Sequence, residues 1–408
     1  MGTSGEKSEK RWELFRASNY LSLMWPCFEL SRIYGLFPYK FNSKGVIVPS
    51  KYGWIYATFI SIVNTIFIGV ILYLMDISKD LAFDSVPGTL QGNCYLLLAW
   101  WVAVVSYLLH SKRMRMLRNF ASVSANLSAS SFKRLSRIIH GKDIIGFLFL
   151  MIQATNLYSS RLDLATSKVV SMYATLLVFF MDMLYADCVL VIGECFKNIN
   201  EKLLTLKMNM EKDQPHLLRR VYHEKHNPLI LMEIRGIKSQ HNDVSELVHC
   251  LNQTFSLQLV ASVTMTFAEV TFSLYFYILQ CLGKTGINME KQIWYSYFST
   301  SVTYYAWKLV VIVWACEMSK DQAVKTGIIV HEVLIDTVDK QVKEELQLFS
   351  LQVLHRDNTF TARGLTLDAT LLTSVVGGIT TYLLILIQFM VSSKSCGSAM
   401  DPTSPPRT

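Results

Sequence analysis

Residues 369–393 read ATLLTSVVGGITTYLLILIQFMVSS and contain no Asp, Glu, Lys or Arg. A helix needs about 20 apolar residues to cross the hydrocarbon core of a bilayer, whereas the core helices of soluble domains are usually shorter and amphipathic. The run therefore predicts a membrane-spanning helix close to the end of this sequence.

Comparable runs occur throughout the chain, in which 51% of the residues are hydrophobic and 17% are charged. Three more are free of acidic and basic residues, at Gly53–Met75, Ser85–Leu109 and Leu247–Ala268. Three further spans are expected at Ile144–Ser160, Val169–Ile192 and Ile293–Cys316, the last two with embedded charges. The pattern predicts an all-α integral membrane protein with seven transmembrane helices and disfavours a soluble enzyme.

The distribution of basic residues predicts the orientation of these spans. Alternate connecting segments, beginning with the N-terminal one, hold 31 of the 39 lysines and arginines, the other segments hold 7, and Lys308 lies inside a span. Because cytoplasmic segments are enriched in Lys and Arg, we expect a cytoplasmic N-terminus and an extracellular C-terminus. The opening residues show no apolar core of a removable signal peptide, so the first span is expected to direct membrane insertion.

Helical patterns continue outside the spans. Residues 12–39 are apolar at helical spacing with interspersed charges, which favours an interfacial helix on the inner membrane surface. The segments around 111–140, 196–250 and 319–360 are expected to extend the spans inward as amphipathic helices that pack together. A loop is expected between Pro215 and Pro228.

The last span carries a sequence signature, Thr381-Tyr382, five apolar residues, then Gln388-Phe389. A spaced pattern continues upstream through Phe349-Ser350-Leu351-Gln352, Leu354-His355, Phe360-Thr361-Ala362, Gly364 and Leu367-Asp368. Together these residues resemble the insect gustatory receptor family. One departure follows Gly364, where the family often has a bulky aromatic residue and this chain has Leu365-Thr366.

The resemblance implies a tastant-gated, non-selective cation channel in the plasma membrane of sensory neurons, assembled as a homotetramer or heterotetramer. It implies a division into residues 1–318, the ligand-binding bundle, and residues 319–408, a cytoplasmic anchor helix with the pore-lining helix. It further implies that the last helix lines a central pore, with Ile385, Gln388 and Phe389 at matching positions. Asp368, Glu344 and Glu345 are candidates to favour cations at the inner exit.

A stripe of small and polar residues marks one face of the last span: Ser374, Gly378, Thr381, Ile385 and Gln388. Their steps of four and three residues place them along one side of a helix. The stripe fits either close packing of helices within one subunit or a pore formed by several copies. In the pore interpretation, Thr381, Ile385, Gln388 and Phe389 form the gate.

Charges inside the spans are the second candidate site. Asp182, Asp187, Glu269 and Lys308 are costly at that depth unless they are paired or face water. We expect a charge pair among Asp182, Glu269 and Lys308, which lie near one level of the membrane. Such a pair is either structural or the floor of a polar ligand pocket.

Aromatic and polar residues of spans two to six form the third candidate site, since small organic ligands favour such linings. Tyrosines are also common at membrane interfaces without any ligand role. The candidates are Tyr95, Gln153, Asn156, Tyr158, Tyr173, Glu269, Phe272, Tyr275, Tyr297, Tyr304 and Lys308.

Other classes of protein remain open at this stage. A G-protein-coupled receptor requires an outside N-terminus, which the basic residues oppose, and a transporter is expected to show repeated halves, which the sequence lacks. No catalytic motif, phosphate loop, metal-ligand spacing or cofactor motif occurs, and the cysteines suggest no disulfide framework. We expect neither catalysis nor a cofactor nor nucleic-acid binding, and the expected partners are a small tastant, lipid and other subunits.

Overall fold

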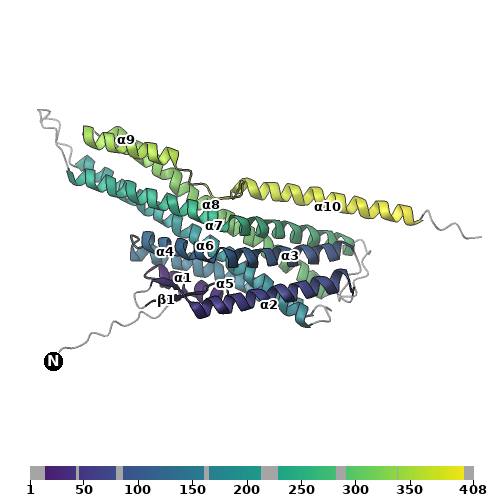
Figure 1. Cartoon of the computed structure of the whole chain (residues 1–408). Coiled ribbons are helices and arrows are strands. Elements are labelled where there is room, and N and C mark those ends of the chain that lie inside the picture. Colours follow the sequence, from purple (N-terminus) through teal and green to yellow (C-terminus); the bar gives the residue numbers. More distant parts are fainter. Residues whose placement is uncertain are drawn as a thin grey trace, which may run out of the picture.

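The computed structural model describes residues 14–42, 46–79, 86–159, 165–212, 228–281, 291–337 and 339–398. It is almost entirely helical (Figure 1). The helices are α1 (Tyr20–Ile33), α2 (Lys51–Asp76), α3 (Val86–Leu108), α4 (His110–Ser124), α5 (Ala129–Ser159), α6 (Ala165–Lys212), α7 (Pro228–Cys281), α8 (Lys291–Asp336), α9 (Lys340–His355) and α10 (Ala369–Ser398). Two antiparallel hairpins complete the described part, β1 (Tyr39–Phe41) with β2 (Ile47–Pro49), and β3 (Thr361–Ala362) with β4 (Leu365–Thr366).

Each of the seven predicted spans corresponds to one long helix, in order α2, α3, α5, α6, α7, α8 and α10, although the predicted end residues Ser85 and Ser160 lie outside the described residues. Within the described residues, α2, α3, α6, α7 and α10 are long and apolar enough to cross a membrane by length and composition. α5 and α8 do not reach that threshold there. In α8 the reason is Lys308 and its neighbouring tyrosines, which lower the mean hydropathy of an otherwise apolar segment.

α6 is the central helix of the bundle. It contacts α1, α2, α3, α4, α5, α7 and α8, and its most apolar 18-residue window is completely buried. α10 instead lies along the edge of the bundle, packed on α7 and α8, and only 11% of its corresponding window is buried (Figure 1).

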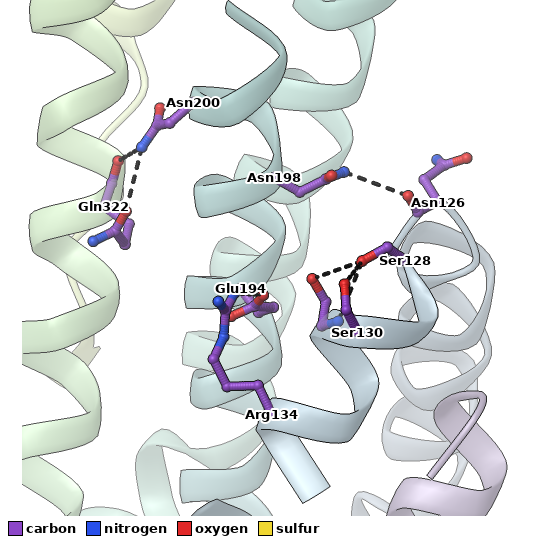
Figure 2. Close-up of polar contacts among 9 residues, drawn as sticks. Asn126, Ser128, Ser130, Arg134, Glu194, Asn198, Asn200 and Gln322 are labelled. Carbon is purple, nitrogen blue, oxygen red and sulfur yellow. Dashed lines mark hydrogen bonds and ion pairs between the residues drawn. The ribbon is translucent and has the colours of Figure 1, made fainter. Parts of the chain in front are cut away.

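The predicted helical extensions of the spans are confirmed, while their inward direction stays a prediction. α6, α7 and α8 continue well beyond the apolar runs, and α9 packs on α7 and α8 at that end of the molecule (Figure 1). Figure 2 shows polar contacts at the inner part of α6. There Arg134 of α5 forms an ion pair with Glu194, and Asn200 donates a hydrogen bond to the backbone oxygen of Gln322 on α8 at 2.9 Å. The expected loop between Pro215 and Pro228 lies mostly outside the described residues, and Pro228 begins α7.

The helix expected within residues 12–39 is present as α1, with one face covered by protein, and its place on the inner membrane surface stays a prediction. Leu23, Met24 and Phe28 are buried, because α1 packs against α6, α4 and α5. An apolar helix face looks the same in sequence whether lipid or protein covers it. Gly35 follows the end of α1 with a φ of +73°, a conformation that glycine adopts readily.

The hairpin β3–β4 connects α9 to α10 through a two-residue turn at Arg363 and Gly364. Their φ angles are +52° and +89°, as expected for the tight turn that suits the twist of paired strands. Gly364 belongs to the sequence signature, and this turn gives the physical reason for a glycine there. Leu365, which replaces the bulky aromatic residue, packs partly buried against the core.

Candidate functional site

A buried ion pair lies in the centre of the bundle. The Nζ atom of Lys308 on α8 is 3.0 Å from Oδ2 of Asp182 on α6, and both side chains are at most 1% exposed. Ser262 of α7 donates a hydrogen bond to Asp182 and accepts one from Lys308 at 3.0 Å. Three helices are therefore joined by one polar cluster, and the expected charge pair is confirmed for Asp182 and Lys308.

Glu269 is not the partner of Lys308 in this cluster. Its carboxylate accepts a hydrogen bond of 2.9 Å from the side-chain amide of Gln91 on α3, and the residue is 6% exposed. Phe272 and Tyr275 of the same helix are also buried, at 8% and 6%. These candidates lie on the side of α7 that faces the bundle.

A second buried ion pair was not predicted. Asp187 of α6 is 2.6 Å from the Nζ atom of Lys142 on α5, which also lies 2.6 Å from Asp143. The sequence placed Lys142 in a cytoplasmic segment directly before a span. The available signal was Asp187 itself, an acidic residue in an apolar run that required a partner.

Several aromatic candidates are held by contacts within the subunit. The Tyr95 hydroxyl donates to the backbone oxygen of Ser171 at 2.8 Å, and the Tyr173 hydroxyl donates to that of Tyr34 at 3.0 Å. Tyr304 is 1% exposed and lies one helical turn from Lys308 on α8.

The remaining candidates are less well placed. Gln153 is half-buried, and its Oε1 atom has no hydrogen-bond partner in the described part of the chain. The side chains of Asn156, Tyr158 and Tyr297 lie outside the described residues. The structure thus brings Asp182, Tyr304 and Lys308 together and places Glu269, Phe272 and Tyr275 on the neighbouring helix.

The stripe on α10 is divided between two environments. A Cβ atom on Gly378 would lie 2.9 Å from the ring of Phe267 on α7, and the rings of Phe267 and Tyr382 pack edge to face at 5.6 Å. Gly378 therefore serves packing within the subunit. The gate candidates do not share this contact, since Thr381 and Gln388 are exposed, Ile385 is 51% exposed and Phe389 is 76% exposed.

The inner end of α10 is tied to the bundle. Asp368 accepts hydrogen bonds from the backbone N–H and hydroxyl of Thr370, and these bonds lower the pKa of its carboxyl. The backbone N–H of Ala369 donates to Glu317 of α8 at 3.0 Å. These contacts connect the start of α10 with the helix that carries Lys308.

The two glutamates proposed for the inner exit of the pore differ in whether they are paired. Glu345 of α9 forms ion pairs with Arg235, at 3.1 Å, and with Lys238, both on α7. The lysine hydrogen bond is the main reason that the pKa of Glu345 is lowered. Glu345 therefore joins α9 to α7, whereas Glu344 is exposed.

Comparison with known proteins places this arrangement in a family. Residues 26–392 match the family described as 7tm chemosensory receptor. A putative gustatory receptor 28b of Drosophila melanogaster is 33% identical over 160 residues, 38% of this chain and 34% of that protein. A gustatory receptor for sugar taste, 43a, of the same species is 26% identical over 38% of this chain and 36% of its own length. The matched part thus spans about a third of the length of these curated relatives.

The fold matches a solved receptor over nearly the whole chain. The insect olfactory receptor OR5 from Machilis hrabei, solved in complex with eugenol, superposes with a TM-score of 0.63, covering 90% of this chain and 97% of that one at 12% identity. This likeness confirms the all-α membrane fold. With a family match across most of its residues, this multi-pass membrane chain belongs to the 7tm chemosensory receptor family.

Proposed function

We propose that the chain is a subunit of a tastant-gated, non-selective cation channel in which α10 from four identical or related copies lines a shared pore. The observation that carries the proposal is the exposed amide of Gln388, which forms no hydrogen bond within the described residues although it lies in an apolar helix. An unpaired amide is costly in lipid. A water-filled pore removes that cost.

The gate is assigned to the same face of α10. Ile385 and Phe389 lie one helical turn apart, and both are exposed in the single subunit. In a symmetric assembly each forms a ring, and narrow apolar rings exclude water and ions. Thr381 lies one turn further inward and donates its hydroxyl hydrogen to the backbone oxygen of Gly377 at 2.9 Å.

A small organic ligand is assigned to the bundle of residues 1–318, and residues 319–408 carry α9 and the pore helix. Tyr304 and Lys308 are the first choice of contact residues, with Glu269, Phe272 and Tyr275 on the neighbouring helix. The sugar-taste relative and the eugenol complex support a small-molecule ligand. A ligand that contacts the open state more favourably shifts the equilibrium between closed and open arrangements of α10 toward the open one. The expected location of the channel is the plasma membrane of sensory neurons.

Expression in cells without other receptors, with current recording during application of a tastant panel, tests the proposal. Ile385→Ser and Phe389→Ala are expected to raise the current without ligand, and Gln388→Ala is expected to change relative ion permeability. Val376→Ser is the matched control, because Val376 is 63% exposed on the opposite face of α10. Surface expression of every variant is measured in parallel.

Two results would contradict the pore. Normal surface expression with unchanged leak and permeability in all three variants removes the assignment of α10. An equal effect of Val376→Ser shows that substitution on any face of α10 disturbs the protein. Epitope tags at both termini, stained with and without permeabilisation, test the orientation, for which an extracellular C-terminus is expected.

A further inference from the structure

An open cavity of about 600 Å³ lies beneath the hairpin β3–β4, at the inner end of the spans. One wall is α7, with His249, Gln253 and Ser256. The opposite wall is the segment that leads to α10, with Asp357 and Arg363, and Lys112 of α4 closes a third side. None of these residues takes part in the pore or in the polar cluster of the bundle.

The charges that line this cavity are mainly positive. Lys112 and Arg363 are exposed, and neither forms an ion pair within the described residues. The carboxylate in the lining, Asp357, accepts the backbone N–H of Thr359 at 3.0 Å. The cavity therefore has an excess of positive charge.

The cavity wall is held in place by specific contacts. Asn252 of α7 donates from Nδ2 to the backbone oxygen of Thr359 at 2.8 Å and accepts the backbone N–H of Thr361 at 3.3 Å. The two-residue turn then fixes Arg363 at the tip of the hairpin. On the opposite wall, His249 and Gln253 are joined by a hydrogen bond of 2.8 Å. Cationic and hydrogen-bonding groups thus face one space from three elements.

Membrane depth indicates the source of a ligand. Lys112 follows the end of α3 at Leu108 closely, and Arg363 shortly precedes the start of α10 at Ala369. Both basic residues therefore lie where spans meet the inner interface, given the cytoplasmic N-terminus expected from the basic residues. Basic pockets between helices at that level suit the phosphate groups of anionic lipids.

We propose that this cavity binds the phosphorylated headgroup of an anionic lipid of the inner leaflet. Lys112 and Arg363 contact the phosphate oxygens, and His249 and Gln253 supply further hydrogen-bonding groups. Because Arg363 sits on the hairpin that leads directly into α10, an occupied cavity holds that hairpin against α7. The effect on current rests on the proposed channel function, whereas binding does not.

The test measures binding first, with the purified full chain in nanodiscs. The probe is a fluorescent phosphatidylinositol bisphosphate, and its fluorescence anisotropy is measured as receptor is added. Lys112→Gln and Arg363→Gln are each expected to weaken binding by about tenfold, as for loss of one charged contact. Arg115→Gln and Arg356→Gln are matched controls, because both residues lie close in sequence to the targets but outside the lining, and both are expected to bind normally.

The outcomes separate the alternatives. Equal weakening by the control variants, or unchanged binding in both target variants, overturns the site. Competition by soluble inositol trisphosphate as strong as that by unlabelled lipid overturns the lipid source and leaves a soluble phosphate ligand. Tastant-evoked current is recorded separately in membranes with and without the lipid. Absence of any current in every membrane contradicts the channel function, while the binding result decides the site independently.

Discussion

α6 and α10 have nearly equal mean hydropathy in their most apolar windows, yet they occupy opposite environments. Every residue of that window is buried in α6, whereas 11% is buried in α10. Hydropathy therefore identifies both as membrane helices without distinguishing the centre of the bundle from its edge. The difference lies in what surrounds each helix, because protein covers the apolar window of α6, whereas α10 packs mainly on α7 and α8 in the part of the chain that the structure describes.

The polar residues do distinguish the two helices. α6 carries Asp182 and Asp187, each paired with a lysine of a neighbouring helix. α10 carries no charge in its apolar run but has small residues, hydroxyls and the exposed Gln388. Charges that require partners within the subunit mark the central helix, whereas the polar groups of the edge helix are uncharged.

The largest effect is expected from Lys142→Met, which leaves Asp187 buried near Asp143 without a cation. Removal of one partner of a buried pair typically costs about 3 to 5 kcal/mol. We expect loss of most correctly folded protein in size-exclusion chromatography, with partial recovery when Asp187→Asn is added. Normal yield and thermal stability of the single variant would show that Lys142 is dispensable to the fold.

A somewhat smaller loss of folding stability is expected from Lys308→Met, because Ser262 still donates a hydrogen bond to Asp182. We expect reduced surface expression and a lower thermal midpoint, with a loss of unfolding free energy near the lower end of the about 3 to 5 kcal/mol that an unpaired buried charge typically costs. Asp182→Asn in the same chain is expected to restore part of the loss, whereas Glu269→Gln is expected to restore none. If Glu269→Gln restored the loss instead, Glu269 rather than Asp182 would be the partner of Lys308.

The order and type of the helices follow from the sequence, because long apolar runs and basic loops reflect the bilayer directly. A charge pair of Lys308 with Asp182 or Glu269 was also predictable, since all three lie in apolar runs at one depth, whereas the choice of Asp182 required the structure. The partner of Asp187 was not, because Lys142 stands at the boundary of a span and reads as a loop residue. Nor could the sequence show that Gly378 packs on Phe267 while its neighbours in the stripe are exposed, since that depends on the rotation of α10.

A moderate effect is expected from Gly193→Ala in α6. The added Cβ would lie 2.5 Å from Oγ and 3.2 Å from Cα of Ser319 on α8, whose hydroxyl donates to the backbone oxygen of Val189 at 2.8 Å. Overpacking in a dense core typically costs about 1 to 3 kcal/mol. Thermal unfolding followed by a thiol-reactive dye measures this, because Cys188 and Cys316 are buried until the bundle opens. An unchanged midpoint would mean that α6 and α8 move apart to accommodate the added methyl group with little loss of stability.

The smallest effect is expected from Gly377→Ala in α10. Nothing lies within 4 Å of the added Cβ, and alanine favours a helix over glycine by about 1 kcal/mol, so the subunit fold is expected to be unchanged or slightly more stable. Gly69→Ala in α2 is the matched control, because that exposed glycine also has nothing within 4 Å. The same dye assay compares the two. If Gly377→Ala lowers the midpoint as much as Gly193→Ala while Gly69→Ala does not, another surface covers α10 in the assembled protein. In that case the difference in burial between α6 and α10 exists only in the single subunit, because assembly buries the face of α10 that one chain leaves exposed.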